Sequence, residues 1–277
     1  MFGKFFESLF FSTDSRSYWK PEHYGLKGIG FKSKTVSGHE IDGLVLQPKG
    51  EAAADGALIL FFHAAKFNRE FNLPQAAFFA MKGYRVVLFD YSGCGMSDGD
   101  TTLDGLLEDG EAVLSWLDAS EFSDKKLILF AQGIGCDAAL QLCDAHKDRV
   151  LGLILESPYA SRKGWAKDRW GPVLGDIAAH GLEYQAREPE EILSELEIPA
   201  VILFPEKDTF IHSQQRKAVI AAASDKVEIW KVPKLRFLGI FGGAENEWHR
   251  AVLKWTGKLV KGPTKKSKTQ EAGKSSQ

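Results

Sequence analysis

A regular alternation of apolar runs with amphipathic stretches constrains this chain more than any other feature. The runs expected to form strands are residues 28–33, 41–46, 57–63, 84–90, 126–131, 151–156, 200–205 and 226–232. The segments expected to form helices are 74–82, 102–117, 136–146, part of 161–196, 213–223 and 247–260. The middle strands are apolar throughout, as in a parallel sheet covered on both faces. The alternation predicts an α/β fold with a doubly wound, mostly parallel eight-stranded sheet and right-handed crossovers.

The length of 277 residues suits one large α/β domain, and no internal repeat divides it. We expect this domain over residues 25–260, with a short lid at about 161–196, after an N-terminal aromatic segment at 1–24. Residues 261–277 are rich in lysine, serine and glycine and are expected to be a disordered tail. This tail carries a charge of +4 within a net charge of −2, so the body is acidic, which argues against a nucleic-acid partner.

Neither cysteines nor apolar runs point to an oxidising compartment or a membrane span. The three cysteines fit neither a disulfide framework nor a zinc motif, and no apolar run is long enough to cross a bilayer. We therefore expect a cytoplasmic protein without cofactor or metal.

Aromatic residues recur at helical spacing near the N-terminus, at Phe2, Phe5, Phe6, Leu9 and Phe10. A short helix here would carry an aromatic face. We expect that face to pack on the domain. The alternative is shallow insertion into a membrane surface, and that contact would be weak because the segment offers no lipidation site.

One strand-to-helix junction carries the functional question. The apolar run ending at Ala131 leads into Gln-Gly-Ile-Gly and then into a helical stretch, which is the outline of the G-x-S-x-G nucleophile elbow. Gly133 stands at the position of the serine. Glycine has no side chain with which to attack a carbonyl, so this residue decides whether the protein can be a serine hydrolase. Cys136 lies three residues further on and is expected to be a buried structural thiol rather than a substitute nucleophile.

Several segments, taken in order, resemble the α/β-hydrolase superfamily, in particular small-lid serine hydrolases related to bacterial serine-aminopeptidase-like and acyl-thioesterase-like proteins. Residues 60–63 resemble the strand that leads into the oxyanion loop, and 89–99 are close to the D-Y-x-G-x-G-x-S-x-G turn. Residues 153–159 match the strand after the elbow helix, and 204–208 resemble the segment that delivers the triad acid. The likeness runs from about residue 25 to 259.

The resemblance implies a Ser, then Asp or Glu, then His order for the triad, and one of the three positions keeps its expected residue. Asp208 stands at the acid position, and Glu245 replaces the histidine in a stretch that looks like G-x-G-H-N-[DE]-W. A carboxylate beside Asp208 could not relay a proton, and two like charges there would raise one pKa.

The oxyanion loop is altered as well. Where the family often reads His-Gly-Asn-x-Gly-Asn, residues 63–68 read His-Ala-Ala-Lys-Phe-Asn. The backbone N–H groups of Ala65 and Ile134 could still converge as oxyanion donors.

These substitutions predict a catalytically degenerate α/β-hydrolase-fold protein with a binding or regulatory role. Its partner would be a small acyl-type ligand in the old pocket, or another protein at the lid. The lid carries the aromatic residues Trp165, Trp170 and Tyr184.

Two alternatives remain open at this point. One is a hydrolase of an ester, thioester or amide with a non-standard site, in which Asp208 or Glu245 activates water and His249 or His212 assists. The other is a metal site built from Asp208 and Glu245, although no histidine-carboxylate spacing motif supports it.

Overall fold

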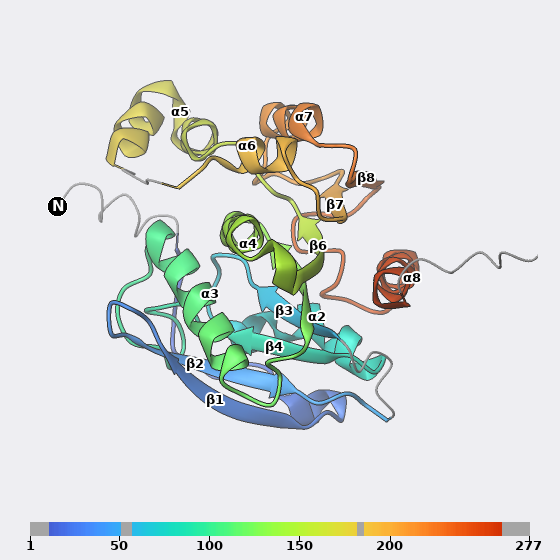
Figure 1. Cartoon of the computed structure of the whole chain (residues 1–277). Coiled ribbons are helices and arrows are strands. Elements are labelled where there is room, and N and C mark those ends of the chain that lie inside the picture. Colours follow the sequence, from blue (N-terminus) through green and yellow to red (C-terminus); the bar gives the residue numbers. More distant parts are fainter. Residues whose placement is uncertain (1–10, 51–56, 182–185, 262–277) are drawn as a thin grey trace, which may run out of the picture.

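In a computed structural model, which describes residues 11–50, 57–181 and 186–261, the chain forms one eight-stranded sheet (Figure 1). The strands lie in the order β1-β2-β4-β3-β5-β6-β7-β8. Their bounds are β1 Gly28–Lys34, β2 Glu40–Leu46, β3 Ala57–Phe62, β4 Arg85–Phe89, β5 Lys126–Gln132, β6 Val150–Glu156, β7 Ala200–Pro205 and β8 Val227–Val232. The pairs β1/β2 and β2/β4 are antiparallel and the remaining pairs are parallel. The expected mostly parallel eight-stranded sheet is confirmed.

The helices are α2 Arg69–Met81, α3 Leu103–Asp118, α4 Gly135–Ala145, α5 Arg162–Gly181, α6 Pro189–Ser194, α7 Ser213–Ala222 and α8 Glu247–Lys261. Most agree with the expected bounds to within about a residue. Helix α2 differs, since it begins five residues before Pro74, where the sequence pattern placed its start. The Asn68 side chain accepts a hydrogen bond from Phe71 N–H at 3.0 Å and caps the helix there. Pro74 is therefore inside the helix.

Successive residues of each central strand point to opposite faces of the sheet. In β3, Leu58, Leu60 and Phe62 belong to a core shared with α3, α4 and α7, whereas Ile59 and Phe61 belong to a second core shared with α2 and α8. This two-residue period is the geometry of an extended strand. Both faces are thus covered, which explains why the central strands read as continuous apolar runs.

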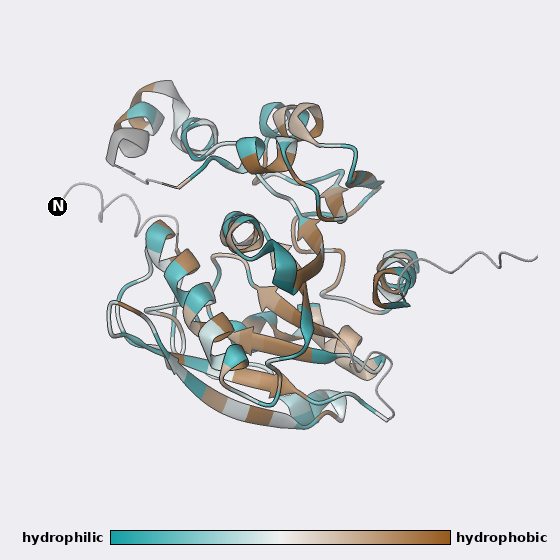
Figure 2. Ribbon diagram, viewed as in Figure 1, coloured by the Kyte–Doolittle hydropathy of each residue, from teal (hydrophilic) through white to brown (hydrophobic). Residues whose placement is uncertain are grey.

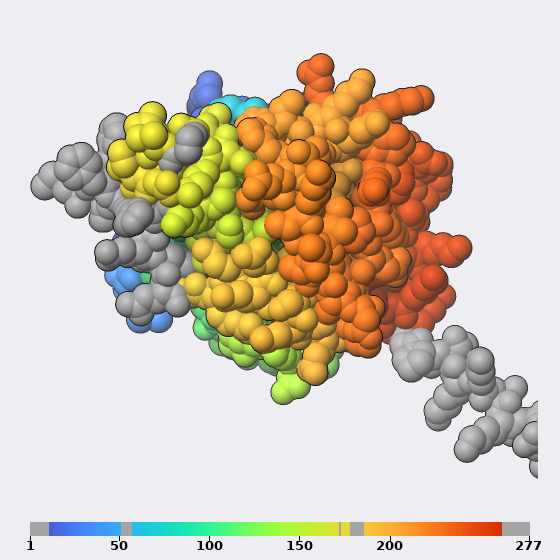
Figure 3. All heavy atoms as spheres, turned by 90° about the horizontal axis from the view of Figure 1, so that it is seen from above, coloured from blue at the N-terminus to red at the C-terminus, as the bar shows by residue number. Residues whose placement is uncertain are grey.

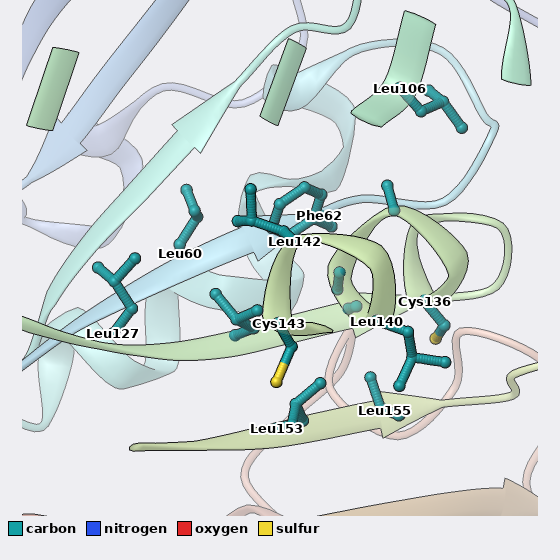
Figure 4. Packing of buried hydrophobic residues seen from close by; sticks show 14 of the residues in the cluster. Leu60, Phe62, Leu106, Leu127, Cys136, Leu140, Leu142, Cys143, Leu153 and Leu155 are labelled. Atoms are coloured by element: carbon teal, nitrogen blue, oxygen red, sulfur yellow. The ribbon is translucent and has the colours of Figure 1, made fainter. Parts of the chain in front are cut away.

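Figure 4 shows the first of these cores, where leucines of β3, β5 and β6 meet α4. Cys136 and Cys143 of α4 point into this cluster as small buried side chains. In Figure 2 the strands are mostly brown, while many residues on the outer faces of the helices are teal. Apolar area removed from water stabilises the fold by about 25 cal/mol per Å², so these two cores are its principal stabilising feature.

Helices α5, α6 and α7 lie together above one end of the sheet (Figure 1), and Figure 3 looks onto them. They span most of the expected lid and the segment after β7. Gly171, with φ at 79°, breaks the helical path of α5. The expectations for residues 1–10, for Tyr184 and for 262–277 lie outside the described residues.

Candidate functional site

The turn between β5 and α4 has the sharp strand-to-helix geometry of a nucleophile elbow. Gly133 has φ at 56°, a left-handed conformation that glycine adopts without a steric penalty. Its N–H donates a hydrogen bond to the Glu156 carbonyl oxygen at 2.9 Å. A Cβ at Gly135 would lie 2.5 Å from the Phe62 carbonyl oxygen, so a glycine is required for α4 to approach β3 this closely.

An aromatic ring lies over the elbow. A Cβ placed on Gly133 would come within 2.9 Å of Phe237 Cζ and 3.7 Å of Ala64 Cβ. Phe237 belongs to the loop that follows β8, and its ring centroid lies 4.8 Å from that of Phe210. The space that a serine side chain would enter is therefore partly filled by Phe237, a residue that the sequence did not single out.

The two expected oxyanion donors face the same cleft. Ala65 and Ile134 both line it, and the N–H of neither donates a hydrogen bond within the described parts of the chain. The loop that carries Ala65 is held by the segment before β1, because Ser12 N–H donates to the Ala65 carbonyl oxygen and Phe67 N–H donates to the Ser12 carbonyl oxygen. The positions predicted for an oxyanion hole are thus close to Gly133, with both donors unengaged.

Asp208 follows β7 and is 7% exposed. Its Oδ1 accepts hydrogen bonds from Phe210 N–H at 2.8 Å and Ile211 N–H at 3.0 Å. Its Oδ2 is buried without a hydrogen-bond partner among the described residues. In a serine hydrolase, the second carboxylate oxygen would hold the histidine. Phe210 and Ile211 line the cleft, so the carboxylate lies immediately behind its wall.

Glu245 does not lie where the resemblance to the G-x-G-H-N-[DE]-W stretch would bring it. It is about half exposed, forms an ion pair with Lys82 Nζ at 2.9 Å, and lines a separate cavity of about 520 Å³. The hydrogen bond and positive charge of Lys82 lower the pKa of the Glu245 carboxyl. The expected repulsion between Glu245 and Asp208 is therefore wrong, because the loop after β8 turns Phe237 and Leu238, not Glu245, toward the elbow.

A different carboxylate lies near Asp208. Glu156 ends β6 and is fully buried, and burial, together with the charge of Asp208, raises its pKa to about 8. Its Oε2 accepts a hydrogen bond from Gln132 Nε2 at 2.5 Å. Gln132 in turn donates to Gln75 Oε1 at 3.2 Å. Glu156 was not among the residues predicted for the site, although a glutamate that ends an otherwise apolar strand is a usable signal.

The two histidines proposed as assistants do not line the cleft. His249 is in the first turn of α8, 1% exposed, and packs edge-on against the rings of Phe78 and Phe241. Burial lowers its pKa. Its expected position at a helix start is found, but it is buried rather than on the surface. His212 is exposed and lies 3.9 Å from Asp168. Neither is placed to assist Asp208 over Gly133.

Other candidate groups are also unsuited to chemistry in the cleft. The Cys136 thiol is buried and donates to the Glu156 carbonyl oxygen at 3.5 Å, and burial raises its pKa well above the usual value. His63 precedes the oxyanion loop, and burial lowers its pKa to about 4, so its ring is neutral at pH 7. No group of three or more potential metal-ligating side chains occurs among the described residues, so Asp208 and Glu245 do not form the metal site considered above.

The cleft over Gly133 has a volume of about 650 Å³. Its lining residues are Phe11, Ser12, Ala64, Ala65, Lys66, Phe71, Gln75, Gly133, Ile134, Tyr159, Trp165, Arg169, Phe210, Ile211, Phe237 and Leu238. Two lid-side rings, Tyr159 and Trp165, stack with centroids 5.3 Å apart. The lining contains aromatic and aliphatic side chains with a few polar groups, a composition typical of a small-molecule site of this size.

Comparison with known proteins agrees with this architecture. Residues 56–183 match the sequence model described as serine aminopeptidase, S33. The structure resembles a Pyrococcus furiosus esterase with a TM-score of 0.72 at 14% identity, covering 89% of this chain and 97% of the esterase. It also resembles a thermophilic esterase from Thermogutta terrifontis with a TM-score of 0.62 at 18% identity, covering 84% and 99% of the two chains. At such identities the structural likeness defines the fold alone.

Curated relatives extend the comparison. The chain is 28% identical to protein bem46 of Schizosaccharomyces pombe over 61% of its own length and 57% of that protein. It is 23% identical to the Escherichia coli K12 protein YfhR, named uncharacterized, over 88% and 84% of the two chains. It is 28% identical to the Danio rerio lysophosphatidylserine lipase ABHD12 over 58% of its length and 45% of that protein.

The fold, the elbow and the matched pattern together define the class. This chain has the α/β-hydrolase fold, and its residues 56–183 match the serine-aminopeptidase-like pattern. Within the described part of the chain, no helix combines the length and apolar character that a bilayer crossing requires.

Proposed function

We propose that this protein is a non-catalytic member of the superfamily that binds a small acyl-type ligand in the cleft over Gly133. The observation that carries the proposal is the elbow itself, which has glycine at the nucleophile position and the Phe237 ring 2.9 Å from where a Cβ would be. Covalent catalysis needs a nucleophile with an activating base, and neither group is found at this turn.

The remaining geometry of the cleft suits binding. Its volume is that of ordinary small-molecule sites, and its walls are formed largely by Phe71, Tyr159, Trp165 and Phe210. The unengaged N–H groups of Ala65 and Ile134 can donate hydrogen bonds to a carbonyl or carboxylate oxygen without any chemistry following. A ligand with an apolar chain and one polar end matches both features.

The second candidate is hydrolysis of an ester, thioester or amide. The buried Oδ2 of Asp208 without a partner, and the two unengaged donors, are features that a hydrolase would use. Two of the similar proteins are named for hydrolysis of this kind, the Danio rerio lysophosphatidylserine lipase and the Pyrococcus furiosus esterase. A water molecule would then replace the serine, and the Asp208 carboxylate would take its proton, because no histidine lines the cleft.

Two measurements on the full chain separate these candidates. We expect no labelling by a fluorophosphonate probe and no hydrolysis of short p-nitrophenyl esters above the uncatalysed rate. We also expect decanol to bind, as measured by calorimetry, and its binding to be lost in Ala65→Trp, which fills the cleft. The matched control is Met96→Trp, at an exposed residue that does not line the cleft.

Ester hydrolysis at ordinary enzyme rates, abolished by Asp208→Asn, would overturn the proposal in favour of the second candidate. If decanol does not bind the unmodified chain and no hydrolysis occurs, both candidate functions of the cleft are rejected.

A further inference from the structure

The charged groups that line the cleft over Gly133 are of one sign. Lys66 and Arg169 line it, whereas none of its lining residues is Asp or Glu. Both cationic side chains are exposed, and neither forms an ion pair with a described residue. This is unusual for the chain, because its body is acidic overall and many of its other lysines and arginines are paired with carboxylates.

The two cations reach the cleft from different elements. Arg169 lies one helical turn after Trp165 on α5, and residues at this spacing share a helix face. Lys66 is on the oxyanion loop, and its Nζ lies 5.9 Å from the centroid of the Phe71 ring, which also lines the cleft. Each cation therefore accompanies an aromatic wall of the cleft.

Two buried carboxyl groups close to the elbow do not line the cleft. Asp208 lies behind Phe210 and Ile211, with one oxygen engaged by their N–H groups. Glu156 is fully buried beyond the elbow and does not line the cleft. Neither is paired with Lys66 or Arg169, so the two positive charges stay available to a ligand.

We propose that the cleft selects a single-chain amphiphile with an anionic head, whose head lies at Lys66 and Arg169 and whose alkyl chain lies among the aromatic residues above Gly133. This inference rests on the proposed binding function and adds the charge of the ligand to it. A guanidinium matches the geometry of both carboxylate and phosphate, so a fatty carboxylate and a single-chain phosphate ester share the required chemistry.

Four probes with the same alkyl chain test the head group by calorimetry on the full chain: decanoate, decyl phosphate, decanol and decyltrimethylammonium. We expect the two anions to bind about tenfold more tightly than decanol and the cation to bind most weakly. Raising the salt concentration from 50 to 500 mM should weaken binding of the anions and leave decanol nearly unchanged. Tighter binding of decyl phosphate than of decanoate would identify a phosphate head, and the reverse a free carboxylate.

Two single substitutions locate the head. Lys66→Met and Arg169→Met should each weaken binding of the two anions about three- to tenfold, and weaken decanol binding by a smaller factor. The matched control is Lys163→Met, which removes a lysine of the same helix that lies 4.0 Å from Asp176 and does not line the cleft. It should leave all four affinities unchanged.

Equal affinity for decanol and the anions, with no salt dependence, would overturn this inference and leave the proposed function standing. Failure of every probe to bind would overturn both. The salt series uses the unmodified chain, so the inference stays falsifiable even if a substituted protein does not fold.

Discussion

The loops after β5 and β8, which hold the predicted serine and histidine positions of a catalytic triad, differ in how closely they match the geometry of an active hydrolase. The turn after β5 has the backbone of a nucleophile elbow without a nucleophilic side chain, since Gly133 takes the left-handed conformation and Gly135 permits the approach of α4. The loop after β8 instead places Phe237 over the elbow and Glu245 in an ion pair with Lys82.

The difference follows from packing. The elbow joins the buried strand β5 to the first turn of the buried helix α4, so few backbone paths fit there. The loop after β8 leaves a strand with several partly exposed residues and has space in which to change. Tight packing therefore fixes the shape of the first loop, whereas the course of the second loop is less constrained.

The largest expected effect comes from restoring a nucleophile and a base together. Phe237 contacts both the Gly133 position and Phe210, two residues after Asp208, so it is the residue best placed for a histidine. We expect Gly133→Ser with Phe237→His to hydrolyse short p-nitrophenyl esters about a hundredfold faster than the uncatalysed reaction, because general base catalysis contributes at least that much.

The matched control for this rebuilding is Gly133→Ser with Glu245→His. We expect no activity from it, because Glu245 lines a different cavity. Neither Gly133→Ser nor Phe237→His alone should suffice, since triad members act as a unit. Equal activity of the two double variants would show that the loop after β8 moves. The difference in position between Phe237 and Glu245 would then not determine which residue reaches the elbow.

The next largest effect is on stability and compares two glycines. Gly135→Ala should lower the free energy of unfolding by about 1–3 kcal/mol, because its Cβ would overlap backbone oxygens of Phe62 and His63. Gly243→Ala, in the loop after β8, should change it by less than about 0.5 kcal/mol, since no atom lies within 4 Å of its Cβ position. Urea titration of both variants measures the difference. Similar losses in the two would mean that the loops are equally constrained.

A third effect depends on pH and concerns the carboxyl beneath the elbow. The pKa of Glu156 is raised from 4.5 to about 8, so the folded chain retains a proton that the unfolded chain releases. The native protein therefore loses stability as the pH rises through this window, by up to about 1.4 kcal/mol for each pH unit. We expect Glu156→Gln to remove this loss.

The pH-dependent loss of stability caused by Glu156 is measured by thermal unfolding at pH 5, 6, 7 and 8. The quantity compared is the melting temperature of Glu156→Gln minus that of the native chain. Asp90 and Asp109, whose pKa values burial raises to about 6 and about 7, are present in both proteins and cancel in the difference. A difference that does not grow between pH 5 and pH 8 would mean that Glu156 ionises normally.

The smallest expected effect is at Asp208, the residue at the predicted position of the triad acid. Asp208→Asn keeps an oxygen to accept from Phe210 and Ile211, so it should cost at most about 1 kcal/mol and leave decanol binding unchanged. Loss of binding at an unchanged melting temperature would show that Asp208 acts on the ligand. Asp208 as a former triad acid remains a prediction from the resemblance.

Much of the fold could be predicted because its signals are local. All eight strands appear within about one residue of their expected bounds, since the apolar runs of a parallel sheet are unbroken. The start of α2 was wrong because Pro74 looked like a first helical residue, whereas the cap at Asn68 lies further back. The elbow, Ala65 and Ile134 could be located because short turn motifs fix their own geometry.

The sequence by itself determined the order of strands and helices, the left-handed glycine at the elbow and the absence of a serine there. Only the tertiary structure decided that Phe237 covers the elbow, that Glu156 lies near Asp208, and that Glu245 pairs with Lys82. Period and turn chemistry act over a few neighbouring residues, so a single sequence carries them. The meeting of groups from the ends of different strands depends on how the whole sheet packs and where a long loop comes to rest.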